Sequence, residues 1–121
     1  DTMCNETAYI KARNILLTAN SPVFVTPGDN DWNDCPDPDA AWGHWTRHFM
    51  DFDLNWRHSL RVRRMSERKE NISFFRDFVL FVGVNLVGGS RVSFQEHRAR
   101  MNDNLAWTVG EIKSNLRKLT S

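Results

Sequence analysis

A short apolar stretch that runs directly into an acidic turn constrains this chain more than any other feature. Residues 23–25, Val-Phe-Val, are β-branched or aromatic and have the length of a buried strand. Pro27-Gly28 turns the chain at their carboxyl end, so residues 29–31, Asp-Asn-Asp, are expected at a strand tip. Open α/β sheets bind ligands at strand tips, and carboxylate and carboxamide oxygens suit divalent cations. The segment therefore predicts a metal site.

The size and charge of the chain exclude several classes of protein. Its 121 residues, 40% hydrophobic and 12% aromatic, suffice for one core of ordinary size and predict one domain at most. The net charge of +1 gives no overall attraction to nucleic acid. The longest apolar run, Phe78 to Val87, falls well short of the roughly 20 residues that span a bilayer. We expect no membrane span, and the sequence leaves the oligomeric state undetermined.

Periodicity and capping residues predict a layered α/β domain with helices flanking a short sheet. Asn5 can cap a first helix, and Asp39 a second one with a buried aromatic face. Residues 51–70 fit neither period and are expected to form short helix and loop. Residues 72–75 and 78–87 are predicted to form a hairpin-like pair of strands, the second apolar on both faces and central.

A break at Gly88-Gly89-Ser90 follows the second strand, and a long helix comes next. Its apolar residues recur along one stripe, and such a stripe normally faces a protein core. The stripe consists of Phe94, Met101, Leu105, Val109, Ile112, Leu116 and Leu119.

The run from Ser21 to Asp31, Ser-Pro-Val-Phe-Val-Thr-Pro-Gly-Asp-Asn-Asp, resembles a segment of the calcineurin-like metallophosphoesterases. In that family a strand ends in a Gly-Asn-His-Asp or Gly-Asn-His-Glu turn. A helix precedes it, an aromatic-rich helical insert follows, and then come paired strands and a helix with a Trp, here Trp107. The likeness covers most of the chain, and its specific part is the Gly-Asp-Asn-Asp turn. It implies part of a four-layered α/β/β/α sandwich.

The resemblance also implies a cofactor and a reaction. Family members hold two divalent metal ions, with Mn, Fe and Zn not distinguished here, and hydrolyse phosphate esters with a metal-bridging hydroxide. Asp29 stands where the family has a metal-binding Asn, Asn30 replaces its His, and Asp31 matches the acidic residue that steadies that His. Asp31 is thus the candidate catalytic residue. In a register shifted by one, Asn30 is the metal ligand instead. Asn30 cannot donate a proton as His does.

Other motifs of the family have no counterpart in this chain. Its opening Asp-x-His, its Gly-Asp-x-x-Asp and its closing Gly-His-x-His are all missing. We therefore expect 1–121 to be an incomplete domain, the central section of a longer enzyme, and to be inactive alone. His44 and His48 lie four apart on a predicted helix, but without a third ligand nearby we expect them to be surface or half-buried residues.

Three alternatives remain open at this point. The first is a noncatalytic scaffold relative, which the loss of the His at Asn30 favours. The second is a phosphate- or nucleic-acid-binding module that uses the basic segment 57–69, although a solvated basic face is expected and nucleic acid is not a favoured partner. The third is a purely structural Asx turn at 29–31. The basic segment contains Arg57, Arg61, Arg63, Arg64, Arg68 and Lys69.

The cysteines and two sequons bear on location. Cys4 and Cys35 are the only cysteines and can form one disulfide or remain two thiols; the sequence leaves both open. Asn5-Glu-Thr and Asn71-Ile-Ser match the N-glycosylation acceptor pattern. Together they add slight support for a secretory or extracellular location.

Overall fold

The computed structural model describes residues 4–88 and 92–119, so Gly89 and Ser90, part of the predicted break, lie outside the described residues. Within this part the fold is mixed α/β, as predicted, with three α-helices and one three-stranded antiparallel sheet. The four-layered sandwich stays a prediction. The α-helices are α1 (Glu6–Leu16), α2 (Pro38–Phe49) and α3 (Phe94–Leu119); the strands are β1 (Arg63–Arg64), β2 (Ile72–Arg76) and β3 (Val79–Gly83); 3-10 turns cover Asp29–Asp31 and Phe52–Asn55.

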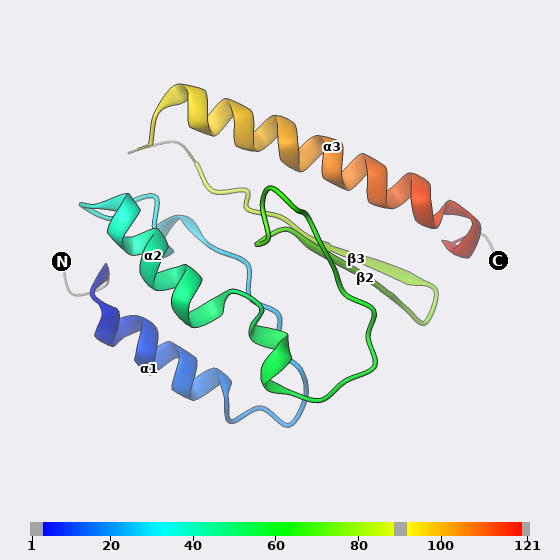
Figure 1. Ribbon diagram of the computed structural model, residues 1–121, viewed down its shortest axis with the longest axis horizontal. Coiled ribbons are helices and arrows are strands. Elements are labelled where there is room, and N and C mark those ends of the chain that lie inside the picture. Colours follow the sequence, from blue (N-terminus) through cyan, green and yellow to red (C-terminus); the bar gives the residue numbers. More distant parts are fainter. Residues whose placement is uncertain (1–3, 89–91, 120–121) are drawn as a thin grey trace.

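The helices lie on two sides of the molecule. Figure 1 shows α1 and α2 side by side on one side and α3 running along the β2–β3 hairpin on the other. No helix in the described ranges combines the length and the apolar character needed to cross a bilayer.

Side-chain caps start the first two helices. The Asn5 side chain accepts a hydrogen bond from the backbone N–H of Ala8 at 3.1 Å, as predicted for α1. The predicted cap of α2 is wrong by two residues, because Asp37 rather than Asp39 accepts from the N–H of Ala40, at 3.0 Å. Pro38 occupies the first helical turn, where its missing N–H and fixed φ are tolerated, and this places the cap before it.

Aromatic residues of α2 form the centre of the core, which confirms the prediction of a buried aromatic face. One cluster combines Tyr9 of α1 with Trp45, Phe49 and Phe52. A second joins Trp32, Cys35, Ala41 and Val87. The Trp42 ring stacks on Trp45 at 5.1 Å between centroids and connects the two clusters.

A disulfide joins Cys4, just before α1, to Cys35, with 5.9 Å between their Cα atoms. Of the two states that the sequence left open, the structure therefore has the bonded one. The bond ties the start of α1 to the loop that leads into α2.

Residues 22–27 pass between the helix pair and the hairpin without joining the sheet. Val23 and Val25 pack on the cluster of Tyr9 and Trp45, whereas the Phe24 ring stacks on Phe74 of β2 at 4.6 Å. This alternation of sides is that of a strand. Yet the predicted strand is wrong as a sheet member, because no other described residue pairs with this stretch in a ladder.

The predicted hairpin is confirmed, but its second strand, predicted over 78–87, is shorter, because β3 covers only Val79–Gly83. β2 and β3 pair antiparallel from Ile72 with Gly83 to Arg76 with Val79. Asp77 and Phe78 both have positive φ, 51° and 64°, as the two-residue hairpin turn that matches strand twist requires. The prediction of a central second strand is wrong, since the order is β1-β2-β3 and β2 is in the middle.

The last helix presents the opposite face from the one predicted. Six residues of the apolar stripe are exposed and Met101 is half-buried. Arg100, Asn104, Glu111 and Asn115 are buried instead. The reason is polar pairing: the residues after β3 and the side chains of β2 present hydrogen-bonding groups to α3, and its polar side chains satisfy them. The exposed members are Phe94, Leu105, Val109, Ile112, Leu116 and Leu119.

Candidate functional site

The predicted site residues form a tight 3-10 turn at the end of the extended stretch. We call Gly28–Asp31 the acidic corner. Asp31 Oδ2 accepts a hydrogen bond from the N–H of Gly28 at 2.7 Å, and the Asp31 N–H donates to the Gly28 carbonyl at 3.1 Å. A Cβ on Gly28 would lie 3.3 Å from Asp31 Oδ2, closer than most such contacts, so this position favours glycine. The corner is thus held closed by Asp31.

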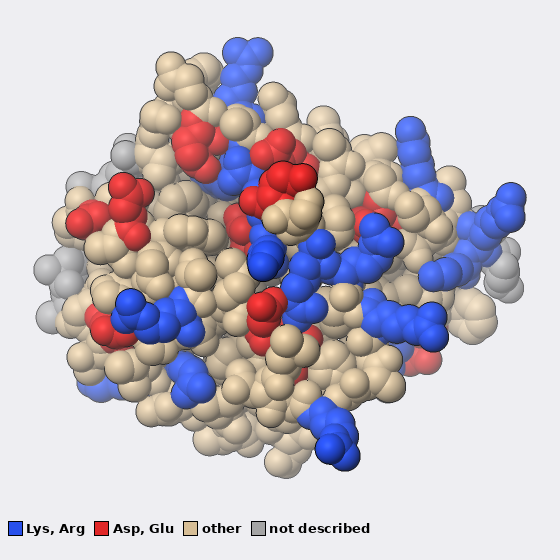
Figure 2. All heavy atoms as spheres, viewed as in Figure 1, with Lys and Arg blue, Asp and Glu red and all other residues tan. Residues whose placement is uncertain are grey.

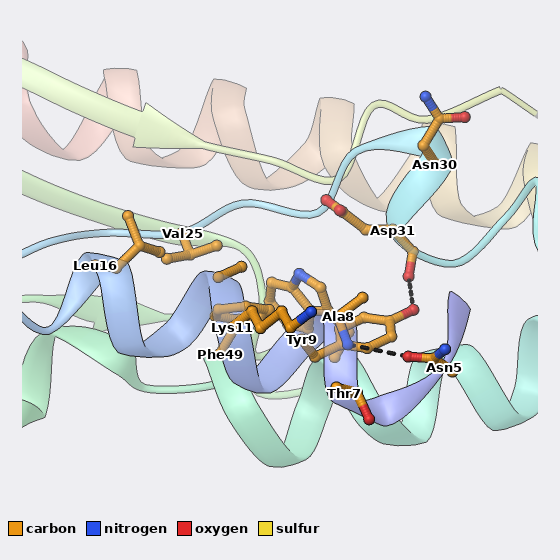
Figure 3. A pocket seen from close by; sticks show the side chains of 12 residues that line it. Asn5, Thr7, Ala8, Tyr9, Lys11, Leu16, Val25, Asn30, Asp31 and Phe49 are labelled. Carbon is orange, nitrogen blue, oxygen red and sulfur yellow. Dashed lines mark hydrogen bonds between the residues drawn. The ribbon is translucent and has the colours of Figure 1, made fainter. Parts of the chain in front are cut away.

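The three predicted side chains differ in what they do in this turn. Asp29 Oδ1 accepts from the N–H of Asn30 at 2.9 Å, and no described residue donates to its other oxygen. All three residues are exposed. Figure 3 shows the Asn30 side chain pointing away from the rest of the labelled residues, whereas the Asp31 carboxylate turns back toward the corner. Asp31 therefore braces the turn, and Asp29 and Asn30 present oxygens outward.

Tyr9 holds the corner from below, a role that the sequence analysis did not identify. Its hydroxyl donates to the main-chain carbonyl of Asp31 at 2.5 Å, and its side chain is 4% exposed (Figure 3). Burial raises the pKa of the Tyr9 phenol, and the charge of Asp31 raises it further. The phenol therefore remains a donor over a wide pH range. Tyr9 is the only tyrosine, yet nothing in the spacing links it to residue 31.

A cavity of about 670 Å³ lies beside the corner. Its lining combines apolar residues such as Leu16 and Phe49 with the polar residues Asn5, Asn30 and Asp31 (Figure 3). An apolar hollow with a few convergent polar groups is the usual form of a small-molecule site.

The described residues supply an incomplete set of metal ligands. No three His, Cys, Asp or Glu side chains in residues 4–88 and 92–119 are placed to hold a metal ion. The outer oxygens of Asp29 and Asn30 fit a hard divalent cation as two ligands at most. This donor set agrees with the expected family role only if other ligands complete it.

His44 and His48 of α2, expected as surface or half-buried residues, are half-buried and meet a carboxylate of α1. Glu6 Oε1 lies 3.0 Å from His48 Nε2, 2.5 Å from Arg47 Nη1 and 3.9 Å from His44 Nδ1. The hydrogen bonds from His48 and Arg47 lower the pKa of Glu6. The cluster thus links α1 to α2 by charge.

Much of the basic segment 57–69 is already paired with acidic side chains. Arg64 Nε lies 2.5 Å from Asp51, and its Nη2 bonds Asp53. Arg68 lies 2.7 Å from Asp103, and Arg63 contacts Glu111 at 3.2 Å. On the face in Figure 2, basic and acidic side chains alternate over the middle of the molecule. The pairing reduces the positive charge that this segment can present to an external polyanion.

Comparison of the chain with protein-family models, with curated proteins and with solved structures finds no match.

Proposed function

We propose that this chain is the central part of a calcineurin-like metallophosphoesterase, in which the acidic corner contributes to a divalent-metal centre that hydrolyses phosphate esters. One observation carries the proposal. The corner stands exposed at the carboxyl end of residues 22–27, an extended stretch with no ladder partner among the described residues. Backbone groups of such a stretch need partners, and a neighbouring strand would bring further ligands to the same tip.

The roles of the three residues follow from the contacts of the turn. Asp29 offers one carboxylate oxygen to a cation, and Asn30 can add its carbonyl oxygen. Asp31 is a positioning residue, because its Oδ2 is engaged by the Gly28 N–H. When bound, paired divalent ions supply an activated hydroxide and neutralise charge on the phosphoryl group. Tyr9 keeps the corner in place from the side of α1.

Exposed apolar surface supports a larger assembly around this chain. On α3, Leu105, Val109, Ile112 and Leu116 lie along one stripe and are each at least 40% exposed. Surfaces of this kind normally mark contacts with other protein parts. The stripe of α3 would thus find its partner in the remaining parts of the proposed enzyme.

A noncatalytic scaffold relative is the second candidate, and the side chain at residue 30 favours it. A carboxamide has no proton to give to a leaving alkoxide, so a step that the family assigns to His lacks its donor. The polyanion-binding alternative is weaker, because Arg63, Arg64 and Arg68 are already paired with carboxylates.

The test is a hydrolysis assay on the full-length protein. The protein is stripped with a chelator, then assayed with p-nitrophenyl phosphate and bis(p-nitrophenyl) phosphate before and after Mn²⁺ is added. We expect activity to return with the metal. Asp29→Ala should lower kcat/KM by about 100-fold or more, since even the partners that orient a metal ligand are worth about 10–100-fold. Asp39→Ala, an exposed carboxylate outside the corner, is the matched control.

Two variants at residue 31 separate bracing from direct chemistry. Asp31→Asn keeps an oxygen acceptor for the Gly28 N–H, whereas Asp31→Ala removes it. A bracing role predicts that Asn retains most of the activity and Ala loses it. Full activity of Asp29→Ala, or no hydrolysis by the intact protein with any metal, would show that the enzyme proposal is wrong. The noncatalytic scaffold would then be the remaining candidate.

A further inference from the structure

The two N-glycosylation sequons lie in opposite environments. Asn5 and Thr7 of the first are exposed at the start of α1. Asn71 and Ser73 of the second are 0% and 1% exposed, beneath α3. The sequence alone does not distinguish the two as glycosylation sites, because each has the same acceptor pattern.

Asn71 has no room for a sugar in this fold. Its side-chain nitrogen donates to Asn104 Oδ1 at 2.8 Å and to Met65 Sδ at 3.6 Å. Its oxygen accepts from the N–H of Asn85 at 3.0 Å. A glycan replaces one hydrogen of that nitrogen, so it would break a buried bond and push α3 away from β2. Leaving these buried polar groups without hydrogen-bond partners would lower the stability of the fold.

The side-chain oxygen of Asn5 caps α1, whereas its side-chain nitrogen is available for a covalent substituent. Oδ1 accepts from the Ala8 N–H as the helix cap, and no described residue accepts from Nδ2. The cap needs only the oxygen, so a substituent on the nitrogen is compatible with α1. In Figure 3 the nitrogen of Asn5 lies on the side away from the dashed bond to Ala8.

We propose that Asn5 is an N-glycan acceptor and that Asn71 is not. The donor class is an oligosaccharide linked through a diphosphate to a lipid. The Asn5 carboxamide nitrogen attacks the anomeric carbon, forming the C–N bond and losing one proton to a base of the transferase. The bond from that carbon to the diphosphate oxygen breaks, and the lipid diphosphate leaves with the electron pair. No electrons are exchanged with an oxidant or reductant.

The neighbouring disulfide supplies an independent argument for the compartment. Cys4 adjoins Asn5 and is bonded to Cys35, and stable disulfides form in oxidising compartments such as the lumen of the secretory pathway. Glycan transfer takes place in that same lumen. The glycan would stand at the rim of the cavity beside the acidic corner, because Asn5 lines that cavity.

The test is peptide mapping of the native protein. The full-length protein is purified from its own cells, digested with trypsin and treated with peptide-N-glycosidase in heavy-oxygen water, which marks each former glycan site as labelled Asp. We expect the peptide that ends at Lys11 to be labelled and the peptide of residues 70–76 to remain unlabelled. An unlabelled Asn5 or a labelled Asn71 would overturn the proposal.

Matched variants test the acceptor directly in a translation system with microsomes. Asn5→Asp keeps a capping oxygen but cannot accept a sugar, and Thr7→Ala destroys the sequon at an exposed position. Both should abolish the mass shift that endoglycosidase removes, whereas Thr7→Ser should retain it. A mass shift that persists in Asn5→Asp would contradict the assignment of Asn5 as the acceptor. All three variants are expected to fold.

Discussion

Arg100 of α3, completely buried, donates a hydrogen bond from its guanidinium to the main-chain carbonyl of Val87 at 2.8 Å. The same guanidinium reaches the carbonyls of Asn85 and Gly88 at 3.2 Å and is paired with Glu96 at 3.0 Å. One charged side chain therefore hydrogen-bonds the backbone carbonyls of the segment after β3. These bonds hold that segment against α3. This contact is one of those that bury the polar face of α3, together with the bonds of Asn104 and Glu111.

Replacing Arg100 should destabilise the fold more than any exposed charge on the same helix. Arg100→Leu leaves the carbonyls of Val87 and Gly88 without their donor and Glu96 without its partner, whereas the Asn85 carbonyl keeps its bond from Asn104. Leaving buried acceptors unsatisfied costs about 1–3 kcal/mol. Arg98→Leu, an exposed position two residues earlier, should change stability by no more than about 0.5 kcal/mol. Urea unfolding followed by circular dichroism measures both. Equal midpoints for the two variants would contradict the buried role of Arg100.

Because the apolar stripe of α3 is exposed, a polar substitution in it should cost little stability. The sequence pattern, which places such a stripe in a core, predicts a large loss. Leu105 is 66% exposed, so Leu105→Lys should change the free energy of unfolding of the 121-residue chain by no more than about 0.5 kcal/mol. A leucine in a core would lose several times as much. The neighbouring Asn104 bonds Asn71 and the Asn85 carbonyl. Asn104→Leu should cost about 1–3 kcal/mol, because the buried Asn71 nitrogen loses its oxygen acceptor and the Asn85 carbonyl loses one of its two donors. Chemical denaturation of the two variants distinguishes the faces.

The link between Glu6 and His48 predicts an acid-sensitive contact between α1 and α2. His48 and Arg47 lower the folded-state pKa of Glu6. A carboxylate with a lowered pKa adds stability above its unfolded pKa, about 4.3 for glutamate, and loses it as pH falls through the folded value. The urea midpoint of the wild type should therefore exceed that of Glu6→Gln at pH near 6, with the difference shrinking below about 4.3.

The control for this experiment is Asp39→Asn, which removes one exposed carboxylate on α2 without touching the cluster. Raising the salt concentration should reduce the Glu6 effect as well, since exposed ion pairs are screened. A difference between wild type and Glu6→Gln that stays constant down to low pH would argue against the ionised contact.

Restoring a proton donor at residue 30 should matter most for substrates with poor leaving groups, if the proposed function holds. Asn30 is exposed, so Asn30→His introduces no packing conflict. In the full-length protein we expect kcat for an alkyl phosphate to rise by about 10-fold or more, and that for p-nitrophenyl phosphate to change little, because nitrophenolate needs no acid. A rise of equal size for both esters would point to a role other than proton donation.

Local sequence was sufficient for the three helices, for the β2–β3 hairpin and for the turn at the acidic corner, but it did not predict β1. The cap at Asn5, the turn after Pro27 and the hairpin around Asp77 each depend on residues within four positions. The corner's support could not be foreseen, because Tyr9 and Asp31 meet only when α1 packs under the turn. The strand predicted at residues 23–25 was also wrong as a member of the sheet, since pairing depends on which strand lies next to it.

The sequence by itself determined where the helices and the hairpin form, because capping, turn chemistry and periodicity act over a few residues. It also placed an apolar stripe along α3, which leaves polar residues on the opposite face. Only the tertiary structure decided that the polar stripe is buried, because Ser73, Asn71 and the carbonyls after β3 offer partners to Glu111, Asn104 and Arg100. The same packing buries one sequon and exposes the other, since burial belongs to the assembled fold rather than to any segment.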